Sequence, residues 1–222
     1  MVRPVRSTLF DFNGVLVDDE HIHFGAFAEV LARRGIPLSE RDYAERYLGF
    51  DDAGAFRAIL RDGGAASDDA IVRALIDEKK PVYMRRIATE LRVFEGAAEL
   101  IRRRTKLGAV GIVSGALRHE IEHCLAIMGV AHAIAFIVSA EDTRACKPDP
   151  EGYRIGAGKL PGSVPAVAIE DSIAGVVAAR AAGLRCVAVT HSYSRAELEL
   201  AGAHAVADSL PELTDALLDG DL

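Results

Sequence analysis

The chain has 222 residues, of which 50% are apolar and 27% charged, an ordinary composition for a globular protein. This length allows one well-buried domain with a sizeable insertion. The net charge of −7 argues against a nucleic-acid partner, because the sequence has no basic stripe to displace counterions from phosphates. The densest basic run, Arg102-Arg103-Arg104, is predicted on the solvent-facing side of a helix.

The three cysteines, Cys124, Cys146 and Cys186, show no metal-ligand spacing and fit buried thiols in a reducing cytoplasm. Cys146 precedes Lys147, whose charge could make the thiol reactive, but a half-buried spectator is the expected role. Residues 1–6 lead directly into the first strand and leave no room for a signal peptide. No apolar run approaches a membrane span in length, so a cytoplasmic protein without a membrane partner is predicted.

The first predicted strand contains the most informative stretch of the chain. Its apolar run, Leu9-Phe10, ends on the carboxylate of Asp11, and the chain turns at Gly14 before a charged segment begins. Chemistry in open α/β sheets takes place at the carboxyl ends of strands, so Asp11 is predicted there as a nucleophile toward phosphorus. An aspartate that only caps a turn would show the same local pattern.

Residues from about 18 to 93 contain no convincing strand and show helical periodicity instead. Apolar residues share three predicted helix faces: Phe24, Phe27, Ala28 and Leu31; Phe56, Ile59 and Leu60; Tyr83, Ile87 and Leu91. We interpret these faces as the core of a helical subdomain inserted after the first strand. Its hinges are predicted near residues 18–20 and 93–96.

After about residue 95, short β-branched runs alternate with helical patterns. The predicted strands are Ala109–Val113, Ala135–Val138, Ala166–Ile169 and Cys186–Val189, with Ala203–Ala207 as a weaker edge candidate. The predicted helices are Ala116–Met128, Glu151–Lys159, Ile173–Ala181, Arg195–Leu200 and Glu212–Leu218. Continuous apolar strands separated by helices predict a parallel sheet covered on both faces, an α/β, Rossmann-like, doubly wound fold.

Three later segments carry polar side chains suited to phosphate chemistry. Ser114 follows a strand and opens a predicted helix, where its hydroxyl and backbone N–H groups would bind an anion, although serine is also a common helix cap. Lys147, stiffened by two neighbouring prolines, would offset the repulsion between a carboxylate nucleophile and a phosphate. Glu170 and Asp171 end a buried strand; paired buried acids are costly without a cation, so they predict a metal site.

In this order, the four segments resemble the motifs of the haloacid dehalogenase superfamily. Its phosphatases carry Asp-x-Asp-Gly-x-x-x-Asp around the nucleophile, and here the second aspartate is replaced by Asn13. The resemblance spans Asp11 to Gly175 and implies a core domain of residues 1–17 and 94–222. It also implies a helical cap subdomain of residues 18–93.

The Glu170-Asp171-Ser172-x-x-Gly pattern and the cap position resemble the β-phosphoglucomutase and phosphoglycolate-phosphatase-like branch. That resemblance implies Mg²⁺ held by Asp11, the backbone carbonyl of Asn13 and Asp171, with Glu170 in support. It also implies catalytic roles for Asp11, Asn13, Ser114, Lys147 and His23. The phosphate would be bound by Asp11, Gly14, Ser114, Gly115 and Lys147. His23 aligns with a histidine at the cap hinge. The mutase's sugar-phosphate arginine would fall near Asp52, where the charge is reversed, which disfavours a hexose-phosphate mutase.

Asn13 leaves the mechanism open, because an amide cannot protonate a leaving oxygen or deprotonate water at neutral pH. General acid–base catalysis contributes about 10²–10⁴-fold, so the chain could be a slow phosphatase that favours good leaving groups. His23 could supply the missing base when a cap closes. A substrate that needs no acid, such as a haloacid, is disfavoured because Glu170 and Asp171 indicate a magnesium site. An engineered aspartate-to-asparagine change is also compatible with the sequence.

The leading hypothesis is therefore a Mg²⁺-dependent phosphoric monoester hydrolase that acts on small phosphorylated metabolites through an aspartyl phosphate on Asp11. The alternative is a catalytically degenerate protein that binds a phosphorylated ligand or has a regulatory role. A monomer or a weak homodimer fits either hypothesis. The sequence does not select a substrate.

Overall fold

The computed structural model describes residues 7–48, 50–161 and 165–220. The N-terminal residues 1–6, for which no signal peptide is expected, lie outside the described residues. The chain divides into two units, one formed by Met1–Asp18 with Arg92–Leu222 and the other by Asp19–Leu91. The first is called the core unit below, and the second the helical unit.

The core unit is built on a six-stranded sheet in the order β5-β4-β1-β6-β7-β8, in which every neighbouring pair is parallel. The strands are β1 (Ser7–Phe10), β4 (Val110–Val113), β5 (Phe136–Val138), β6 (Ala166–Glu170), β7 (Arg185–Val189) and β8 (Ala205–Ala207). In the register of the central strands, Phe10 lies beside Ile112 on one side and Ile169 on the other. The predicted α/β, doubly wound fold is thus confirmed.

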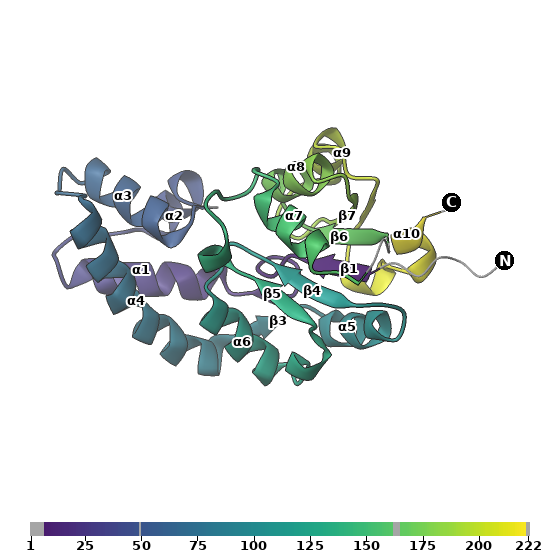
Figure 1. Cartoon of the computed structure of the whole chain (residues 1–222). Coiled ribbons are helices and arrows are strands. Elements are labelled where there is room, and N and C mark those ends of the chain that lie inside the picture. The colour runs from purple at the N-terminus through teal and green to yellow at the C-terminus, as the bar shows by residue number, and fades with distance from the viewer. Residues whose placement is uncertain (1–6, 49, 162–164, 221–222) are drawn as a thin grey trace. The chain divides into compact units, whose positions relative to one another are not determined.

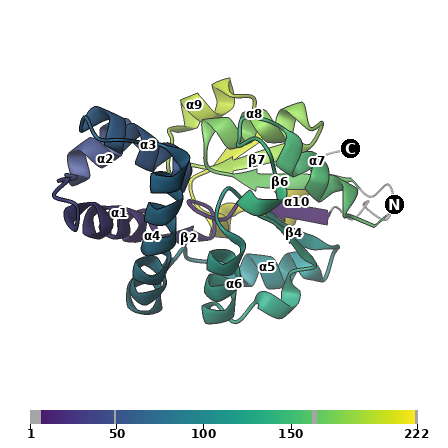
Figure 2. The same ribbon diagram turned by 60° about the vertical axis from the view of Figure 1, so that its left-hand side comes forward.

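Helices cover both faces of this sheet (Figures 1 and 2). On one side lie α7 (Glu151–Gly158), α8 (Ile173–Ala181) and α9 (Arg195–Leu200), and on the other α5 (Ala97–Thr105), α6 (Arg118–Ile127) and α10 (Asp215–Asp219). The face under α7, α8 and α9 carries an apolar cluster in which Leu9, Ala168 and Cys186 are completely buried. Burial on both faces explains why the strands show continuous apolar runs instead of alternation.

The direction in which successive strands are added to the sheet reverses at β1, which makes β1 the topological switch point. From β1 the chain adds β4 and β5 on one side and later β6, β7 and β8 on the other. At such a point the connections leave in opposite directions, which opens a crevice at the carboxyl ends of the central strands. Asp11 follows β1, Ser114 follows β4 and Glu170 ends β6, so the sheet brings three predicted site residues to this crevice.

A short antiparallel pair joins the two ends of the segment expected to lack strands. Val17 pairs with Val93 and Asp18 with Arg92, forming β2 (Val17–Asp18) and β3 (Arg92–Val93). Strands of two residues carry no readable alternation, which is why the sequence did not indicate them.

The helical unit contains α1 (Glu20–Ala32), α2 (Glu40–Arg46), α3 (Asp52–Asp62) and α4 (Asp69–Glu90). Its core includes Phe27, Phe56, Leu60 and Tyr83, all at most 2% exposed. The predicted face of the first helix was partly wrong, since Phe24 and Ala28 are only half-buried.

Arg104 corrects the interpretation of the basic run. It is completely buried; its Nε donates to the Thr8 hydroxyl of β1, and its other nitrogens donate to Asp215 and Asp219 of α10. Arg102 does lie on the exposed face of α5. Every third or fourth residue of a helix shares a face, so one member of a three-residue run can turn inward.

Smaller corrections concern helix ends and Cys146. The last helix begins at Asp215 instead of Glu212, since Leu210–Glu212 form a 3-10 turn before it. Cys124 and Cys186 are buried as expected, but Cys146 is exposed. Among the described residues, no helix is both long and apolar enough to span a bilayer.

Candidate active site

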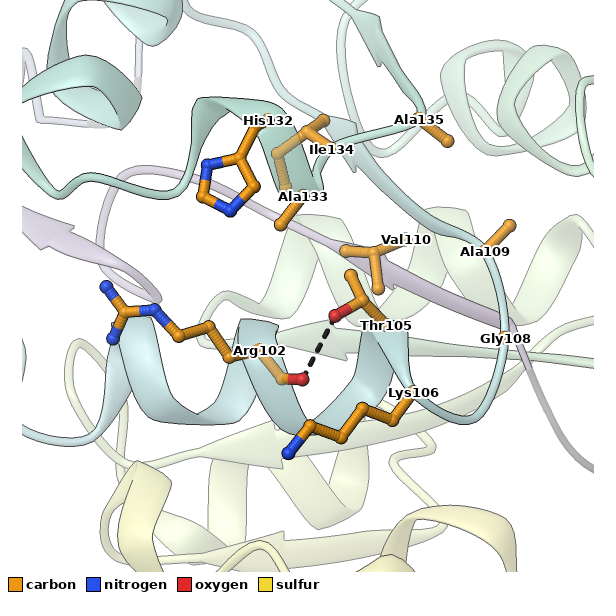
Figure 3. Close-up of a pocket in the computed structure, with 10 residues that line it drawn as sticks. All are labelled: Arg102, Thr105, Lys106, Gly108, Ala109, Val110, His132, Ala133, Ile134 and Ala135. Carbon is orange, nitrogen blue, oxygen red and sulfur yellow. Dashed lines mark hydrogen bonds between the residues drawn. The ribbon is translucent and has the colours of Figure 1, made fainter.

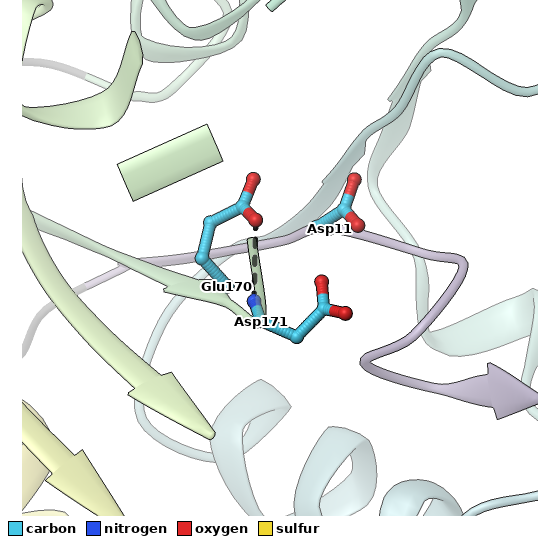
Figure 4. A group of neighbouring side chains, drawn as sticks. All are labelled: Asp11, Glu170 and Asp171. Atoms are coloured by element: carbon cyan, nitrogen blue, oxygen red, sulfur yellow. Dashed lines mark hydrogen bonds between the residues drawn. The ribbon is translucent and has the colours of Figure 1, made fainter. Parts of the chain in front are cut away.

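The site is built from three carboxyl groups at the carboxyl ends of β1 and β6 (Figure 4). Asp11, Glu170 and Asp171 are all buried, and each offers a carboxylate oxygen within 4.8 Å of the others. Glu170 is the last residue of β6 and Asp171 follows it, so the pair faces Asp11 across one strand spacing. Without compensation, three acids this close would repel one another strongly.

Lys147 supplies the compensating charge. Its ammonium contacts Asp11 Oδ1 and lies 2.6 Å from Glu170 Oε1, bridging β1 to β6. It also lies 5.1 Å from the ring centroid of Tyr153, a cation–π geometry. The structure therefore brings Lys147 into direct contact with Asp11, as the sequence predicted.

Glu170 is completely buried and its two oxygens accept hydrogen bonds from the protein. Oε1 accepts from Lys147 and from the Tyr153 hydroxyl, each at 2.6 Å. Oε2 accepts from the Ser172 hydroxyl at 3.1 Å and from the backbone N–H of Asp171 at 3.2 Å. A Cβ at Gly175 would come within 2.0 Å of this carboxyl group, so α8 can approach Glu170 only with a glycine there.

Gly14 and Ser192 fix the position of Asp171. Gly14 has φ +78°, the left-handed region that favours glycine, and a Cβ there would lie 2.0 Å from Asp171 Oδ2. The Ser192 hydroxyl, in the loop after β7, donates to the same oxygen. Two separate segments thus hold the Asp171 carboxylate beside Asp11.

Asn13 and Ser114 lie together at the edge of the acidic cluster. The Ser114 hydroxyl is 3.4 Å from Asn13 Oδ1 and accepts from the Ala116 N–H at 3.1 Å. The expectation that Ser114 opens a helix is wrong, because α6 begins at Arg118. Gly115 therefore lies in a connecting loop, where only its backbone can contact a ligand.

Burial governs the electrostatics of the cluster. It raises the pKa of Asp11 to about 7, although Lys147 opposes the effect. Burial, reinforced by the charges of Asp11 and Glu170, raises the pKa of Asp171 to about 8. Burial alone would lower the pKa of Lys147, but Asp11 and Glu170 outweigh it and raise that pKa. The lysine thus stays charged while the acids compete for protons.

The donor set fits a divalent cation. Three carboxylates and one ammonium leave two negative charges when all four groups are ionised, which one divalent ion would balance. Carboxylate and carbonyl oxygens are hard ligands of the type that Mg²⁺ takes. Because the Glu170 oxygens already accept from protein donors, Asp11 and Asp171 are the carboxylates best placed to bind such an ion directly.

Comparison with known families identifies the chain. Residues 5–183 match the model of haloacid dehalogenase-like hydrolases. The chain belongs to that family. The predicted family and enzyme class are therefore confirmed, and the helical unit lies within the matched range.

Individual relatives of this hydrolase share about 30% of its residues. Protein CbbY of Cereibacter sphaeroides is 31% identical over 94% of both chains. Validoxylamine A 7'-phosphate phosphatase of Streptomyces hygroscopicus subsp. limoneus is 28% identical, over 85% of this chain and 87% of the relative. Phosphoglycolate phosphatase of Caulobacter vibrioides is 29% identical, over 94% and 89%. The phosphatase names agree with the predicted class of phosphoric monoester hydrolase.

A solved relative has the same fold throughout. The structure of an aspartate-to-asparagine mutant of CbbY from Rhodobacter sphaeroides, in complex with xylulose-(1,5)bisphosphate, superposes with a TM-score of 0.85 at 27% identity. The match covers 97% of this hydrolase and all of that chain.

His23 belongs to the helical unit, where it is part of a buried polar network. Its Nδ1 lies 2.9 Å from Lys79 Nζ and its Nε2 lies 3.2 Å from Asp19 Oδ2. Lys79, only 1% exposed, also donates to Asp52 at 2.5 Å. Since an ammonium can only donate, Nδ1 is the acceptor, so both ring nitrogens of His23 already have partners. This arrangement argues against His23 as the replacement base.

Three residues of the site were missed in the sequence. Tyr153 bonds Glu170, Ser192 bonds Asp171, and His191 Nδ1 lies 2.8 Å from the carbonyl oxygen of Gly14. His191 and Ser192 come two and three residues after Val189, the end of β7. The rule that led to Asp11 and Glu170, polar groups just past a buried strand, would have found this pair.

One cavity of the described residues lies away from the acidic cluster. It has a volume of about 600 Å³ and is bounded by α5 and the amino ends of β4 and β5 (Figure 3). Arg102, Lys106 and His132 line it, together with Thr105, Gly108, Ala109, Val110, Ala133, Ile134 and Ala135. It contains none of the predicted site residues, because parallel strands carry their functional groups at the opposite, carboxyl ends.

Proposed function

We propose that this hydrolase is a Mg²⁺-dependent phosphatase of small phosphorylated sugars. The observation that carries the proposal is the Lys147 bridge between Asp11 and Glu170, with Asp171 alongside. In such a cluster the Asp11 carboxylate is held in one orientation, and the Lys147 ammonium reduces the repulsion between Asp11 and a phosphate dianion. The phosphatase names of the relatives support the same reaction class.

The first step uses Asp11 as nucleophile. One of its oxygens bonds to phosphorus and the bond to the leaving sugar oxygen breaks, which gives an aspartyl phosphate and an alkoxide. Lys147 and the hydroxyl of Ser114 hold the phosphoryl oxygens, with the backbone at Gly14 and Gly115 as further donors. A magnesium ion bound by Asp11, Asp171 and the Asn13 carbonyl, with Glu170 in support, would neutralise charge that develops on these oxygens.

Asn13 sets the rate of this chemistry. Its amide can donate a hydrogen bond to the leaving oxygen but cannot transfer a proton, so the alkoxide takes its proton from water. In the second step water attacks the aspartyl phosphate, its proton passes to solvent, and Asp11 and inorganic phosphate are released. We expect a slow enzyme that prefers substrates with good leaving groups.

The substrate class rests on the relatives. The CbbY mutant that contains xylulose-(1,5)bisphosphate carries an aspartate-to-asparagine change, so this substitution is compatible with a bound sugar phosphate in that protein. We also infer that residues 18–93 form the substrate-selecting cap that the family resemblance implies.

A single-turnover assay with 4-nitrophenyl phosphate and Mg²⁺ tests the proposal, with intact-mass detection of phosphoprotein. We expect one phosphate on the wild-type chain and none on Asp11→Asn. Lys147→Ala should slow phosphorylation by at least about 100-fold, in the range for loss of a transition-state donor. Wild-type protein that neither accumulates phosphate nor releases nitrophenol would contradict a hydrolase.

The second candidate is a phospho-ligand-binding protein without turnover. Asn13 favours it, since an amide at this position can act neither as a general acid nor as a general base. Tight binding of a sugar phosphate, with no turnover even after Asn13→Asp, would support this candidate over the hydrolase.

A further inference from the structure

The loop after β7 contacts the segment that carries the proposed nucleophile. We call Asp11–Gly14 the nucleophile loop. The ring nitrogen Nδ1 of His191 lies 2.8 Å from the Gly14 carbonyl oxygen. A carbonyl oxygen can only accept, so Nδ1 carries the proton and His191 donates. The contact joins residues 177 positions apart in the sequence.

Gly14 is thereby held at both of its polar groups. Its N–H donates to the carbonyl of Val17 at 2.8 Å, and its carbonyl accepts from His191. Its left-handed φ and its close approach to Asp171 leave no room for a side chain that could add a further contact. Orientation of this turn therefore depends on backbone hydrogen bonds, and His191 supplies the one that the Gly14 carbonyl accepts.

The imidazole is itself oriented by Phe94. The two rings stack with centroids 3.9 Å apart and planes inclined by 14°. Phe94 is fixed in turn by its N–H, which donates to the carbonyl of Leu16 at 3.1 Å. His191, Phe94 and the segment from Gly14 to Leu16 thus form a closed set of contacts beside the acidic cluster.

We propose that His191 is a positioning residue that holds the nucleophile loop through the Gly14 carbonyl. The peptide group of Gly14 follows that of Asn13 directly, so fixing one restricts the direction of the other. Loss of the donor should let the turn rotate and move Asp11 and the Asn13 carbonyl relative to Asp171. The inference rests on the proposed function only in assigning the nucleophile and metal roles.

Two substitutions separate the hydrogen bond from the ring. His191→Asn places an amide N–H near the position of Nδ1 but removes the stacking surface, whereas His191→Phe keeps a ring on Phe94 and removes the donor. His191→Leu is a second donor-free variant. Hydrogen–deuterium exchange of the backbone amides of residues 12–17, without metal or substrate, reads out the turn directly.

We expect exchange in residues 12–17 to be about 2- to 10-fold faster in the Phe and Leu variants, the factor expected for one net hydrogen bond. The Asn variant should stay close to wild type. Calorimetric titration with Mg²⁺ should show affinity about tenfold weaker for the two donor-free variants only, as for other groups that orient a metal ligand.

If His191 had only a general structural role, its loss would not affect residues 12–17 selectively. Unchanged protection of residues 12–17 in both donor-free variants would overturn the inference, as would faster exchange spread evenly over the core unit. Equal acceleration in the Asn variant would overturn it too. Since exchange needs no turnover, failure of phosphate release would contradict the proposed function without affecting this result.

Discussion

At the scale of single residues, Asp11 and Asn13 differ in the chemistry that they can perform. Asp11 contacts Lys147 and lies beside Asp171, whereas Asn13 offers an amide that cannot transfer protons. Asp11, the proposed nucleophile, thus lies among charged groups, whereas the Asn13 side chain is neutral.

Restoring the acid should accelerate turnover. Asn13→Asp supplies a group that can protonate the leaving oxygen and activate water, so kcat for an alkyl phosphate should rise by about 10²–10⁴-fold with Mg²⁺. Asn13→Ala, the matched control, should remain as slow as wild type. A gain smaller than about threefold in steady-state phosphate release would show that another group already serves as the acid.

Removing the buried charge of Asp11 should stabilise the protein without metal. Burial raises the pKa of Asp11 from 3.8 to about 7, so the folded state favours the protonated form. This preference for the protonated form stabilises the folded state fully below about pH 4, and the stabilisation is lost as the pH rises through about 7. In EDTA, Asp11→Asn should therefore raise Tm at pH 8, and the gain should shrink at pH 5. A lower Tm for this variant at both pH values would contradict the buried-charge account.

At the scale of elements, Arg104 ties three of them together. From α5 it reaches Thr8 in β1 and both Asp215 and Asp219 in α10. The five-residue α10 is too short to be stable alone, so its place on the sheet depends on such contacts. The same arginine is among the largest fully buried side chains of the described residues.

Arg104→Ala should destabilise the fold by about 3–5 kcal/mol, because it leaves the largely buried Asp219 carboxylate without this partner and removes the packing of a fully buried side chain. Urea unfolding followed by far-UV circular dichroism measures the change. Arg102→Ala is the matched control on the same helix: its side chain is 47% exposed, and we expect a change within about 0.5 kcal/mol. Equal effects of the two substitutions would show that burial of Arg104 carries no stability.

At the scale of the whole molecule, the core unit joins two distant stretches of the chain around one acidic cluster. Met1–Asp18 and Arg92–Leu222 both contribute to it, and the cluster lies where β1 and β6 meet. A ligand that binds this cluster therefore stabilises the packing of β1 against the later strands. The helical unit has its own apolar core and no part in the cluster.

Magnesium should raise the melting temperature in a pH-dependent manner. Binding must displace protons from Asp11 and Asp171, whose pKa values are raised to about 7 and about 8. The increase in Tm on adding Mg²⁺ should thus be larger at pH 8 than at pH 6. At 100 times Kd we expect about 2.7 kcal/mol of stabilisation by linkage. Asp171→Asn should abolish the shift, and an undiminished shift in that variant would place the ion elsewhere.

Local sequence patterns were enough to predict the sheet, the order of its strands along the chain and the family. Runs such as Ala166–Ile169 are continuous and apolar because both faces of the strand are buried, and this signal is local. The same reasoning identified Asp11, Ser114, Glu170 and Asp171, since polar groups directly after buried strands stand out from their surroundings.

The contacts that those groups make could be seen only in the folded protein. The inward turn of Arg104, the bridge from Lys147 to Asp11 and the bond from His191 to Gly14 join residues 96 to 177 positions apart. Gly14 and Gly175 were readable as turn or helix residues, but their need to lack a Cβ arises from carboxylates on other segments. Burial of a strand can be predicted from the local sequence pattern. A contact between two loops cannot, because it depends on the order of the strands in the sheet.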